Sequence, residues 1–520
     1  MAFKITYSAL NADMSEIHRE LDGAFTKLKT TLGQEVPSII NGKPVKTGNF
    51  LEDRNPSNND QLLAKFHAVG PEHLNEAYEA ARSAYQKSWG NIPWQERVRV
   101  LKKAADVISD RRLEIATIMV LEVGKSRLEA LGDVEEAADL IRYYAQQVEE
   151  NNGYIRQMGK LSPNENAKSV LRPYGVFTVI APFNFPMALS TGMAAAAMLG
   201  GNTVILKPSD DAPWCAYKLY ECLRDAGIPQ NVFQVVFGNG PALGEAMVKH
   251  PLSDGVVFTG SKEVGLKVIR NAFTNYPKPV LLELGGKNPV FVTDSAKLDV
   301  AVEGCVRSAY GLTGQKCSAL SRIYVHEAVK DAFIAKFKAR TEQIKIGNPE
   351  NKDVFMGPII NARAVTRFLA AVQTAKEEGS ILIGGDNLRG RPGCENGYFL
   401  APTLVQVPTT SRLFKDELFA PFAALTTFTN LQTAIEQANN VEYGLTGGIY
   451  SEKKTEIEYF FDHIEAGILY ANRQSGATTG AWPGVQSFCG WKGSGAGGKG
   501  GCGPYYVAQF MREQSRTVME

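Results

Sequence analysis

Cys317 lies in the polar stretch GLTGQKCSALSR, which runs from Gly311 to Arg322 and contains two glycines. Free cysteines are usually buried and behave as small apolar residues, whereas this one stands between a lysine and a serine. A thiolate in an open bend is a strong nucleophile, because it attacks a carbonyl carbon well and leaves well from a thioester. On this stretch alone, a reactive thiol and an inert side chain both remain open.

Glu283 is the second residue that could take part in chemistry. It opens the motif ELGGK, Glu283 to Lys287, and precedes Cys317 by 317 − 283 = 34 residues. A glutamate can serve as a general base when burial raises its pKa towards neutrality. The alternative is a carboxylate at the end of a strand that accepts hydrogen bonds from the backbone.

The stretch FTGSKEVG, Phe258 to Gly265, follows an apolar run and leads into a helical pattern. A strand, a glycine turn and a helix start together form an anion-binding corner, because free N–H groups and the helix dipole point outward. The Ser261 hydroxyl could bind a phosphate there, or it could simply cap the helix. The usual dinucleotide fingerprint G-x-G-x-x-G does not follow the first strand.

The motif KPSD, Lys207 to Asp210, ends another apolar run. Ligands of doubly wound sheets bind at the carboxyl ends of strands, so this lysine and this acid could hold the ribose hydroxyls of an adenosine. An acid binds a 2′-hydroxyl and repels a 2′-phosphate, which favours NAD over NADP. The alternative is a surface charge pair of little energetic value.

Several elements must position these residues. The β-branched runs GVFTVIAP, NTVILKPS, NVFQVVFG and DGVVFTGS begin at Gly175 and alternate with helical patterns, and a second alternating region extends from about Pro289 to about Gly448. Strands that alternate with helices predict an α/β fold with a doubly wound parallel sheet. Helices are expected before this region, up to Asn151, with breaks at Gly124 and Gly132, and VAQFMREQSRTVM is expected to form a closing strand.

Composition narrows the class of protein. The 520 residues exceed one hydrophobic core, so two or three domains are expected. A net charge of +1 predicts no affinity for nucleic acid or an anionic membrane. Seven cysteines without a CxxC motif predict no disulfide framework and a reducing, cytoplasmic location, and six scattered histidines predict no metal site. The chain is expected to be soluble, without a signal peptide or a membrane span.

Together, PFNFP (Pro182 to Pro186), FTGSKEVG, ELGGK, the Cys317 stretch and ELFAP (Glu417 to Pro421) resemble, in this order and spacing, the aldehyde dehydrogenase superfamily. The resemblance extends from about Pro37 to the end of the chain. It implies a Rossmann-like NAD-binding domain (residues 1–150 and 173–284) and an α/β catalytic domain (residues 285–485). The remaining residues, 151–172 and 486–520, are expected to form a small β oligomerisation arm, for a dimer or a multiple of dimers, and a C-terminal specificity loop.

The resemblance also implies roles for residues. Cys317 is the nucleophile, the side-chain amide of Asn184 and the backbone N–H of Cys317 bind the oxyanion, and Glu283 is the base that activates water. One lost oxyanion donor typically lowers the rate by ~10²–10³. The residues expected to bind NAD are Lys207, Asp210, Gly260, Ser261, Glu417 and Phe419, although many relatives have glutamate at Asp210 and glycine at Ala420.

GQKCSALSR, GVFTVIAPFNFPMAL and ATTGAWPGVQSF resemble the subgroup that oxidises L-glutamate γ-semialdehyde, the hydrolysed form of 1-pyrroline-5-carboxylate, in proline catabolism. Ser318, Lys316 and backbone donors near Gly480 and Ala481 would then bind the substrate carboxylate. Asp139 would face the substrate ammonium, and Phe185 and Phe488 would flank the aliphatic chain. Alternatively, Lys316 is structural and Asp139 lies on a solvated helix face.

The sequence departs from the subgroup beside this pocket. QSFCG replaces the usual QPFGG, and Trp482 and Pro483 replace smaller aliphatic residues. Cys489 and Cys502 are expected to be structural. Three rival functions stay open: oxidation of another aldehyde, transfer of the acyl group to CoA, which would not need Glu283, and a non-enzymatic protein that keeps the fold.

Overall fold

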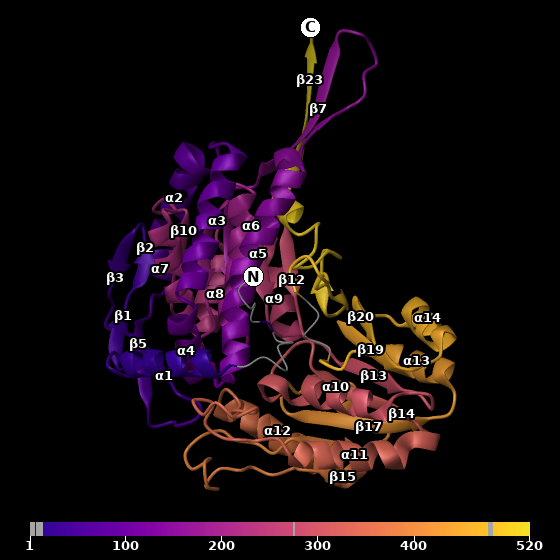
Figure 1. Cartoon of the computed structure of the whole chain (residues 1–520). Coiled ribbons are helices and arrows are strands. Elements are labelled where there is room, and N and C mark those ends of the chain that lie inside the picture. The colour runs from indigo at the N-terminus through magenta and orange to yellow at the C-terminus, as the bar shows by residue number, and fades with distance from the viewer. Residues whose placement is uncertain (1–5, 7–13, 274–275, 477–481) are drawn as a thin grey trace.

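The structure is a computed structural model that describes residue 6 and residues 14–273, 276–476 and 482–520. Two large sheets, each flanked by helices, form the body of the molecule (Figure 1). A narrow β-arm projects from this body and carries the C-terminus at its tip. The α/β class predicted from the alternating pattern is confirmed.

An eight-stranded sheet organises the first part of the chain. Its order is β22-β12-β11-β8-β9-β10-β2-β3, with β8 to β12 parallel to one another. The chain passes from β8 outward to β9 and β10 and then returns to β11 on the other side of β8, which makes the β8–β11 boundary the topological switch point. The strands are β2 (Ser38–Ile40), β3 (Lys43–Val45), β8 (Val176–Ile180), β9 (Thr203–Lys207), β10 (Phe233–Val235), β11 (Gly255–Thr259), β12 (Val280–Glu283) and β22 (Gly495–Ala496).

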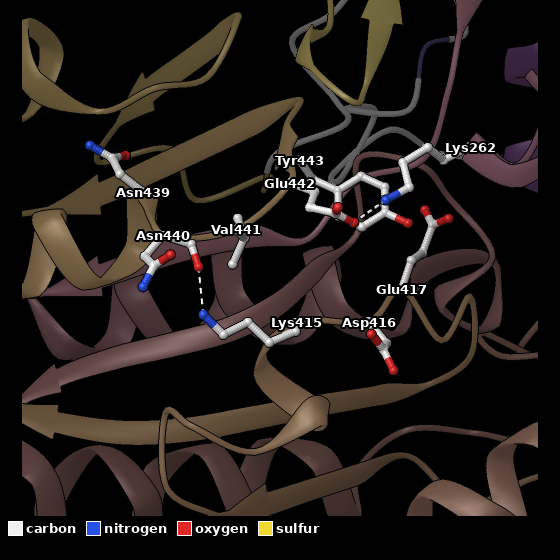
Figure 2. Close-up of a pocket in the computed structure, with 9 residues that line it drawn as sticks. All are labelled: Lys262, Lys415, Asp416, Glu417, Asn439, Asn440, Val441, Glu442 and Tyr443. Carbon is white, nitrogen blue, oxygen red and sulfur yellow. Dashed lines mark hydrogen bonds and ion pairs between the residues drawn. The ribbon is translucent and has the colours of Figure 1, made fainter. Parts of the chain in front are cut away.

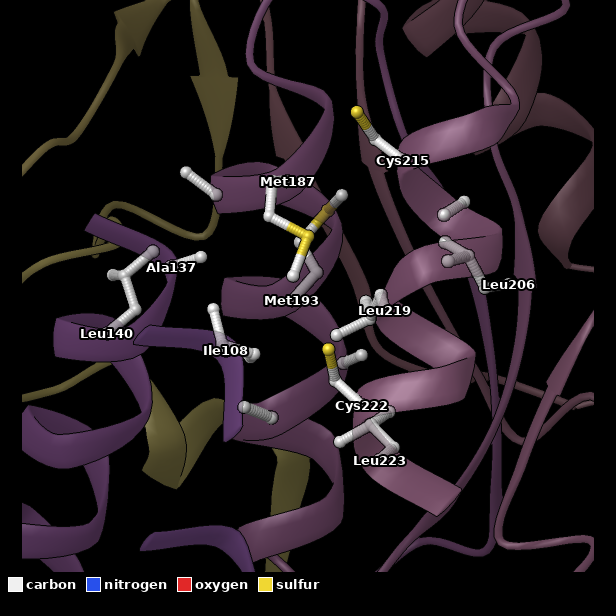
Figure 3. Close-up of a cluster of buried hydrophobic side chains, with 14 of the residues drawn as sticks. Ile108, Ala137, Leu140, Met187, Met193, Leu206, Cys215, Leu219, Cys222 and Leu223 are labelled. Atoms are coloured by element: carbon white, nitrogen blue, oxygen red, sulfur yellow. The ribbon is translucent and has the colours of Figure 1, made fainter. Parts of the chain in front are cut away.

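Helices cover both faces of this sheet. α6 is apolar all round and therefore lies buried. Its Met187 and Met193 belong to the same hydrophobic cluster as Cys215 and Cys222 of α7 (Figure 3). The helices are α1 (Ser15–Lys29), α2 (Leu74–Ala84), α3 (Trp94–Asp110), α4 (Arg112–Val123), α5 (Arg127–Glu150), α6 (Pro186–Leu199), α7 (Trp214–Ala226), α8 (Gly240–Lys249) and α9 (Lys262–Ala272).

Helix α5 supplies several residues of the site described below. Ser126 caps it by accepting from the Glu129 backbone N–H. The predicted break at Gly124 is confirmed, since this residue ends α4 with φ 78°. The break expected at Gly132 is wrong, because α5 continues through it. Tertiary packing explains the difference: Gly132 is buried within the helix bundle, where packing outweighs the ~1 kcal/mol that glycine costs a helix.

A seven-stranded sheet organises the second part, in the order β15-β16-β17-β14-β13-β19-β20. Its strands are β13 (Asn288–Val292), β14 (Leu320–His326), β15 (Ser380–Ile383), β16 (Thr403–Gln406), β17 (Phe422–Phe428), β19 (Thr446–Tyr450) and β20 (Ile468–Ala471). The helices of this part are α10 (Leu298–Tyr310), α11 (Lys330–Glu342), α12 (Ala362–Glu378), α13 (Leu431–Asn439) and α14 (Lys454–His463). Phe291 stacks on Tyr324 in its core, with ring centroids 5.0 Å apart.

The arm is a three-stranded antiparallel sheet in which β7 (Glu165–Pro173) lies between β23 (Met511–Met519) and β6 (Ile155–Gln157). The predicted closing strand is confirmed as β23. Residues 486–520 form more than the arm and loop expected from the sequence. Within them, β21 (Trp491–Lys492) pairs with β18 (Tyr443–Gly444), and β22 joins the first sheet. This segment therefore connects both halves of the molecule before it enters the arm.

Two smaller features complete the fold. A three-stranded sheet of β1 (Gln34–Val36), β5 (Leu62–His67) and β4 (Phe50–Arg54) packs beside the first domain. In the described ranges, no helix is both long enough and apolar enough to cross a bilayer.

Candidate active site

The switch point of the first sheet brings together four of the predicted residues. Asn184 follows β8, Ser261 follows β11, and Lys207 and Glu283 are the last residues of β9 and β12. Because these strands are parallel neighbours, their carboxyl ends meet at one edge of the sheet. Residues that are 99 positions apart in sequence (283 − 184) thus converge at one edge of the fold.

A mostly apolar cavity lies at this edge. Cys317, Glu283 and Ser318 face it, together with residues of α5, α6 and the C-terminal segment. The other described residues that line it are Glu136, Leu140, Tyr144, Phe185, Ala188, Leu189, Gly192, Met193, Thr259, Phe488, Gly501, Cys502 and Tyr506. The described lining therefore combines two thiols, two carboxyl groups and four hydroxyl groups with apolar walls, as expected of a site for a small organic molecule.

The Cys317 bend is built from strained backbone. Leu312 and Thr313 have φ values of 47° and 55°, a left-handed conformation that is uncommon outside glycine. Asn288 supports the bend: its Nδ2 donates to the carbonyls of Cys317 and Ala319, each at 2.8 Å. The thiol is consequently held at the cavity by a network that spans both motifs.

The two glycines of ELGGK are required by close approach. A Cβ on Gly285 would lie 2.1 Å from Glu417 Oε2, and one on Gly286 would lie 2.4 Å from the Cys317 carbonyl oxygen. The Gly286 N–H also donates to Glu417 Oε1 at 2.8 Å. Glycine at these positions thus lets three separate motifs pack against one another.

Burial raises the pKa of the Glu283 carboxyl to about 8, although the Gly501 backbone N–H that donates to it partly opposes this effect. The buried Oε2 has no hydrogen-bond partner within the described residues. Burial also raises the pKa of the Cys317 thiol well above its usual value, and the charges of Glu417 and Glu283 raise it further. Burial therefore favours the neutral form of the thiol, and Glu283 is a nearby group whose pKa lies near neutrality.

Asn184 is buried and its Nδ2 donates to the Gln315 carbonyl at 3.0 Å. Its own carbonyl accepts from Lys125 Nζ at 2.8 Å, and this lysine also bonds to Asp133 at 2.7 Å, with both side chains fully buried. Lys125 Nζ lies 3.8 Å from the ring centroid of Phe185. These contacts fix the loop after β8 and connect it to the Cys317 bend.

Lys207 and Asp210 pair at 2.7 Å at the carboxyl end of β9. The lysine is almost fully buried, which separates this pair from an ordinary surface ion pair. The second carboxylate oxygen of Asp210 accepts from the Gly240 N–H at 2.9 Å. Ser261 caps α9 by accepting from the Val264 N–H, as its alternative interpretation predicted, and Gly260 stands directly before it.

A second pocket lies beside the α9 N-terminus, where Lys262 and Glu417 face the same space from different halves of the molecule (Figure 2). Lys262 pairs with Glu442 across it. Burial raises the pKa of Glu417 to about 7 and lowers that of Lys287 to about 7. Phe419 adopts φ 54° and packs edge-on against Phe183, with ring centroids 5.8 Å apart.

The hydrogen-bond donors and acceptors at this edge of the sheet fit a dinucleotide cofactor. The helix start at Ser261 offers N–H groups to a phosphate, while Asp210 and Glu417 offer carboxylate acceptors to ribose hydroxyls. These groups come from both halves, so the cofactor would lie between the two large sheets.

The substrate residues predicted from sequence divide into three groups. Ser318, Phe185 and Phe488 line the cavity. Lys316 is buried and pairs with Glu129 at 3.1 Å, and Asp139 accepts from the Trp482 indole Nε1 at 2.7 Å, so neither is among the described residues that line the cavity. Gly480 and Ala481 lie outside the described residues.

Sequence reasoning missed three residues. Glu136 lies one helical turn before Asp139 and lines the cavity, and Tyr144 lines it from the same helix. Asn288, which holds the Cys317 bend, directly follows ELGGK. The i, i+3 spacing of Glu136 and Asp139 was the available signal, since residues at this spacing share a helix face.

Comparisons with known proteins agree with this arrangement. The model of the aldehyde dehydrogenase family matches residues 44–515. The 1-pyrroline-5-carboxylate dehydrogenase 1 of Halalkalibacterium halodurans is 36% identical over 508 residues, which cover 96% of each chain. The solved structure of 1-pyrroline-5-carboxylate dehydrogenase from Thermus with bound NAD superposes on this chain with a TM-score of 0.94 at 34% identity. The match covers 100% of this chain and 99% of that one.

A third similarity is to a longer protein. Proline utilization A from Bdellovibrio bacteriovorus superposes with a TM-score of 0.92 at 36% identity. The match covers 97% of this chain and 52% of that one, so this chain corresponds to about half of that longer protein.

Proposed function

Since the chain belongs to the aldehyde dehydrogenase family, we propose that it oxidises L-glutamate γ-semialdehyde, the open form of 1-pyrroline-5-carboxylate, to L-glutamate with NAD. One observation carries the proposal: Cys317, Glu283, Ser318 and Glu136 line a single cavity. These groups provide a nucleophile, a base and two polar contacts of the kinds that this amino-acid aldehyde needs.

Cys317 gives its proton to solvent, and its Sγ adds to the aldehyde carbon. The oxyanion that forms is bound by the backbone N–H of Cys317 and by the side-chain amide of Asn184. Asn184 Nδ2 donates to the Gln315 carbonyl in the free protein, so its second hydrogen serves the oxyanion. An amide suits this role because it donates without titrating.

NAD, when bound, supplies the hydride acceptor that converts the thiohemiacetal on Cys317 into a thioester. Lys207 and Asp210 would hold the adenosine ribose, Gly260 and Ser261 the pyrophosphate, and Glu417 and Phe419 the nicotinamide ribose. Asp210 would disfavour the 2′-phosphate of NADP by charge repulsion.

Glu283 then removes a proton from the water that attacks the thioester, and Cys317 leaves as the thiolate. Its Oε2 has no partner among the described residues and is therefore open to a water molecule. The Gly501 N–H holds the carboxylate while it acts.

The substrate carboxylate is assigned to the Ser318 hydroxyl, together with the backbone near Gly480 and Ala481. The substrate ammonium is assigned to Glu136 in preference to Asp139, because Glu136 is among the described residues that line the cavity and Asp139 is not. Phe185 and Phe488 flank the aliphatic chain. Lys316, paired with Glu129, supports the bend in place of contacting the substrate.

The test compares NADH formation from glutamate semialdehyde with that from propanal and other small aldehydes. A kcat/KM at least tenfold higher for the semialdehyde is expected, and Cys317→Ala should abolish the reaction, while Cys489→Ala, which changes a thiol outside the described cavity lining, should retain it. If kcat/KM for propanal equals that for the semialdehyde, the physiological substrate is another aldehyde. Dependence of turnover on added CoA would instead indicate acyl transfer.

The assembly and location belong to the same proposal. We assign the eight-stranded sheet to an NAD-binding domain (residues 1–150 and 173–284), to which β22 adds an edge strand, and the seven-stranded sheet to a catalytic domain (residues 285–485). Strand β23 is an edge strand that carries exposed Val518 and Met519, and unpaired edges favour pairing with another chain, so a dimer or a multiple of dimers is expected by light scattering. The seven unpaired cysteines support a cytoplasmic location.

A further inference from the structure

Tyr144 joins helix α5 to the C-terminal segment of the chain. Its hydroxyl oxygen accepts from the Cys502 backbone N–H at 3.0 Å, a contact between residues 358 positions apart. The tyrosine is 1% exposed, and its ring packs on that of Tyr506 with centroids 5.4 Å apart. The contact is thus buried, where a lost partner leaves an unsatisfied N–H.

The segment that Tyr144 holds has an unusual backbone. Cys502 adopts φ 61°, a left-handed conformation that L residues rarely choose. Its carbonyl accepts from the Gly484 N–H at 3.0 Å, and the carbonyl of Gly501 accepts from the Phe488 N–H at 2.7 Å. Such a conformation persists only where surrounding contacts impose it, and the Tyr144 hydroxyl is one of them.

The backbone N–H of Gly501, the residue before Cys502, faces the Glu283 carboxylate across the cavity that both residues line, and it lowers the pKa of this carboxyl. A Cβ on Gly501 would lie 3.4 Å from the Tyr144 hydroxyl, which places this hydroxyl directly against the glycine. Tyr144 and Glu283 also line the same cavity. A shift of the Cys502 amide would therefore move the donor that holds Glu283.

We propose that Tyr144 is a positioning residue for Glu283: its hydroxyl holds the Cys502 N–H and thereby keeps the adjacent Gly501 N–H on the Glu283 carboxylate. This inference rests on the proposed function, in which Glu283 activates the hydrolytic water. Tyr144 acts through the 501–502 backbone and needs no contact with the substrate.

The sign of the expected pH effect follows from the charges around Glu283. The Gly501 donor stabilises the ionised carboxylate and lowers its pKa, so losing this donor raises the pKa. The ionisable groups that face Glu283 are acids in their charged forms and cannot replace the donor. They are Glu136 and Tyr144 of α5, Cys317, and Cys489, Cys502 and Tyr506 of the C-terminal segment.

The test is Tyr144→Phe in the full-length enzyme, which removes one oxygen and keeps the ring. Rapid mixing with glutamate semialdehyde and NAD separates the first NADH burst from the slower thioester hydrolysis. The burst should persist, while the pH midpoint of hydrolysis should move up by about one pH unit and the rate at pH 7 should fall about tenfold. Tyr143→Phe is the matched control, because this neighbouring hydroxyl does not line the cavity; its midpoint should match wild type.

A double variant separates positioning from general damage. If Tyr144 acts through Glu283, then Glu283→Gln and the double variant Glu283→Gln/Tyr144→Phe should hydrolyse the thioester equally slowly. Additive losses, or a Tyr144→Phe profile with the wild-type midpoint, would overturn the inference. Absence of NADH from the wild type would instead overturn the proposed function. The thermal midpoint of unfolding checks that each variant is folded.

Discussion

The indole Nε1 of Trp482 donates to Asp139 Oδ2 at 2.7 Å and so ties the chain just after residues 477–481 to helix α5. Asp139 also bonds to Arg142 at 3.3 Å, and Arg142 bonds to Asp106 of α3 at 2.9 Å. Trp482 is 8% exposed, so this hydrogen bond is largely protected from water. Trp482, one of the departures from the subgroup pattern, is therefore fixed to the helix that carries Glu136.

Trp482→Phe should raise KM for glutamate semialdehyde several-fold and lower the stability by about 1 kcal/mol, because it removes the donor and leaves Asp139 less satisfied. The change in KM for propanal should be small, since propanal lacks the carboxylate. Steady-state kinetics and thermal unfolding measure both effects. Trp491→Phe is the control, because Trp491 is 49% exposed; equal effects of both changes would contradict a role for the Trp482 anchor.

Glu283→Gln should separate the two halves of the reaction. The first turnover should give a burst of about one NADH per site, followed by slow hydrolysis, because glutamine cannot accept a proton from water. Wild-type hydrolysis should accelerate as pH rises through about 8, where Glu283 loses its proton. Loss of the burst together with turnover would show that Glu283 is needed before the thioester forms.

The same substitution should change how stability depends on pH. The folded pKa of Glu283, about 8, exceeds the ordinary 4.5, so its protonated form is favoured by folding, and the wild type loses stability as pH rises from about 4.5 through 8. Glutamine at position 283 does not titrate, so Glu283→Gln should unfold at about the same temperature as wild type below about pH 4. It should be more stable by on the order of 4 kcal/mol at pH 8. A difference in unfolding temperature that is constant with pH would contradict this.

Ser318→Ala should lower kcat/KM for glutamate semialdehyde by about 10–100-fold, because a hydrogen bond to a charged group contributes roughly 1.5–3 kcal/mol. The value for propanal should hardly change. Ser321→Ala is a matched control, since the Ser321 hydroxyl has no hydrogen-bond partner among the described residues and lies outside the described cavity lining. Equal losses for both substrates would mean that Ser318 only shapes the bend.

Asp210→Ser should relax the preference for NAD, because it removes the carboxylate that repels a 2′-phosphate. The ratio of kcat/KM for NAD to that for NADP should fall by at least tenfold. Asp299→Ser, which changes an exposed acid paired with Lys336, should leave the ratio unchanged. A wild type that uses both cofactors equally would show that Asp210 does not distinguish them.

Local patterns predicted the fold well, since the β-branched runs became β8 to β11 and Gly124 ended a helix. Asn184, Lys207, Ser261 and Glu283 meet because each stands at the carboxyl end of a parallel strand, whereas Cys317 precedes β14 and Glu417 precedes β17. The sequence did not predict which residues of α5 point into the cavity. Glu136 and Asp139 are three positions apart and so lie on the same face of the helix, and only the packing of α5 determines that Glu136 lines the cavity. The contact of Tyr144 with Cys502 had no local signal, because it joins distant parts of the chain.

The order in which the chain is synthesised gives the C-terminal segment a further consequence. Cys317 emerges from the ribosome well before Phe488, Gly501, Cys502 and Tyr506, which close the cavity around it. N-terminal domains begin to fold during synthesis, so a nascent chain carries the thiol and Glu283 without the walls or the backbone donor that complete the site. The cavity can therefore close only after residues 488–506 have been synthesised, and a chain truncated near residue 487 would carry the thiol and Glu283 without these walls.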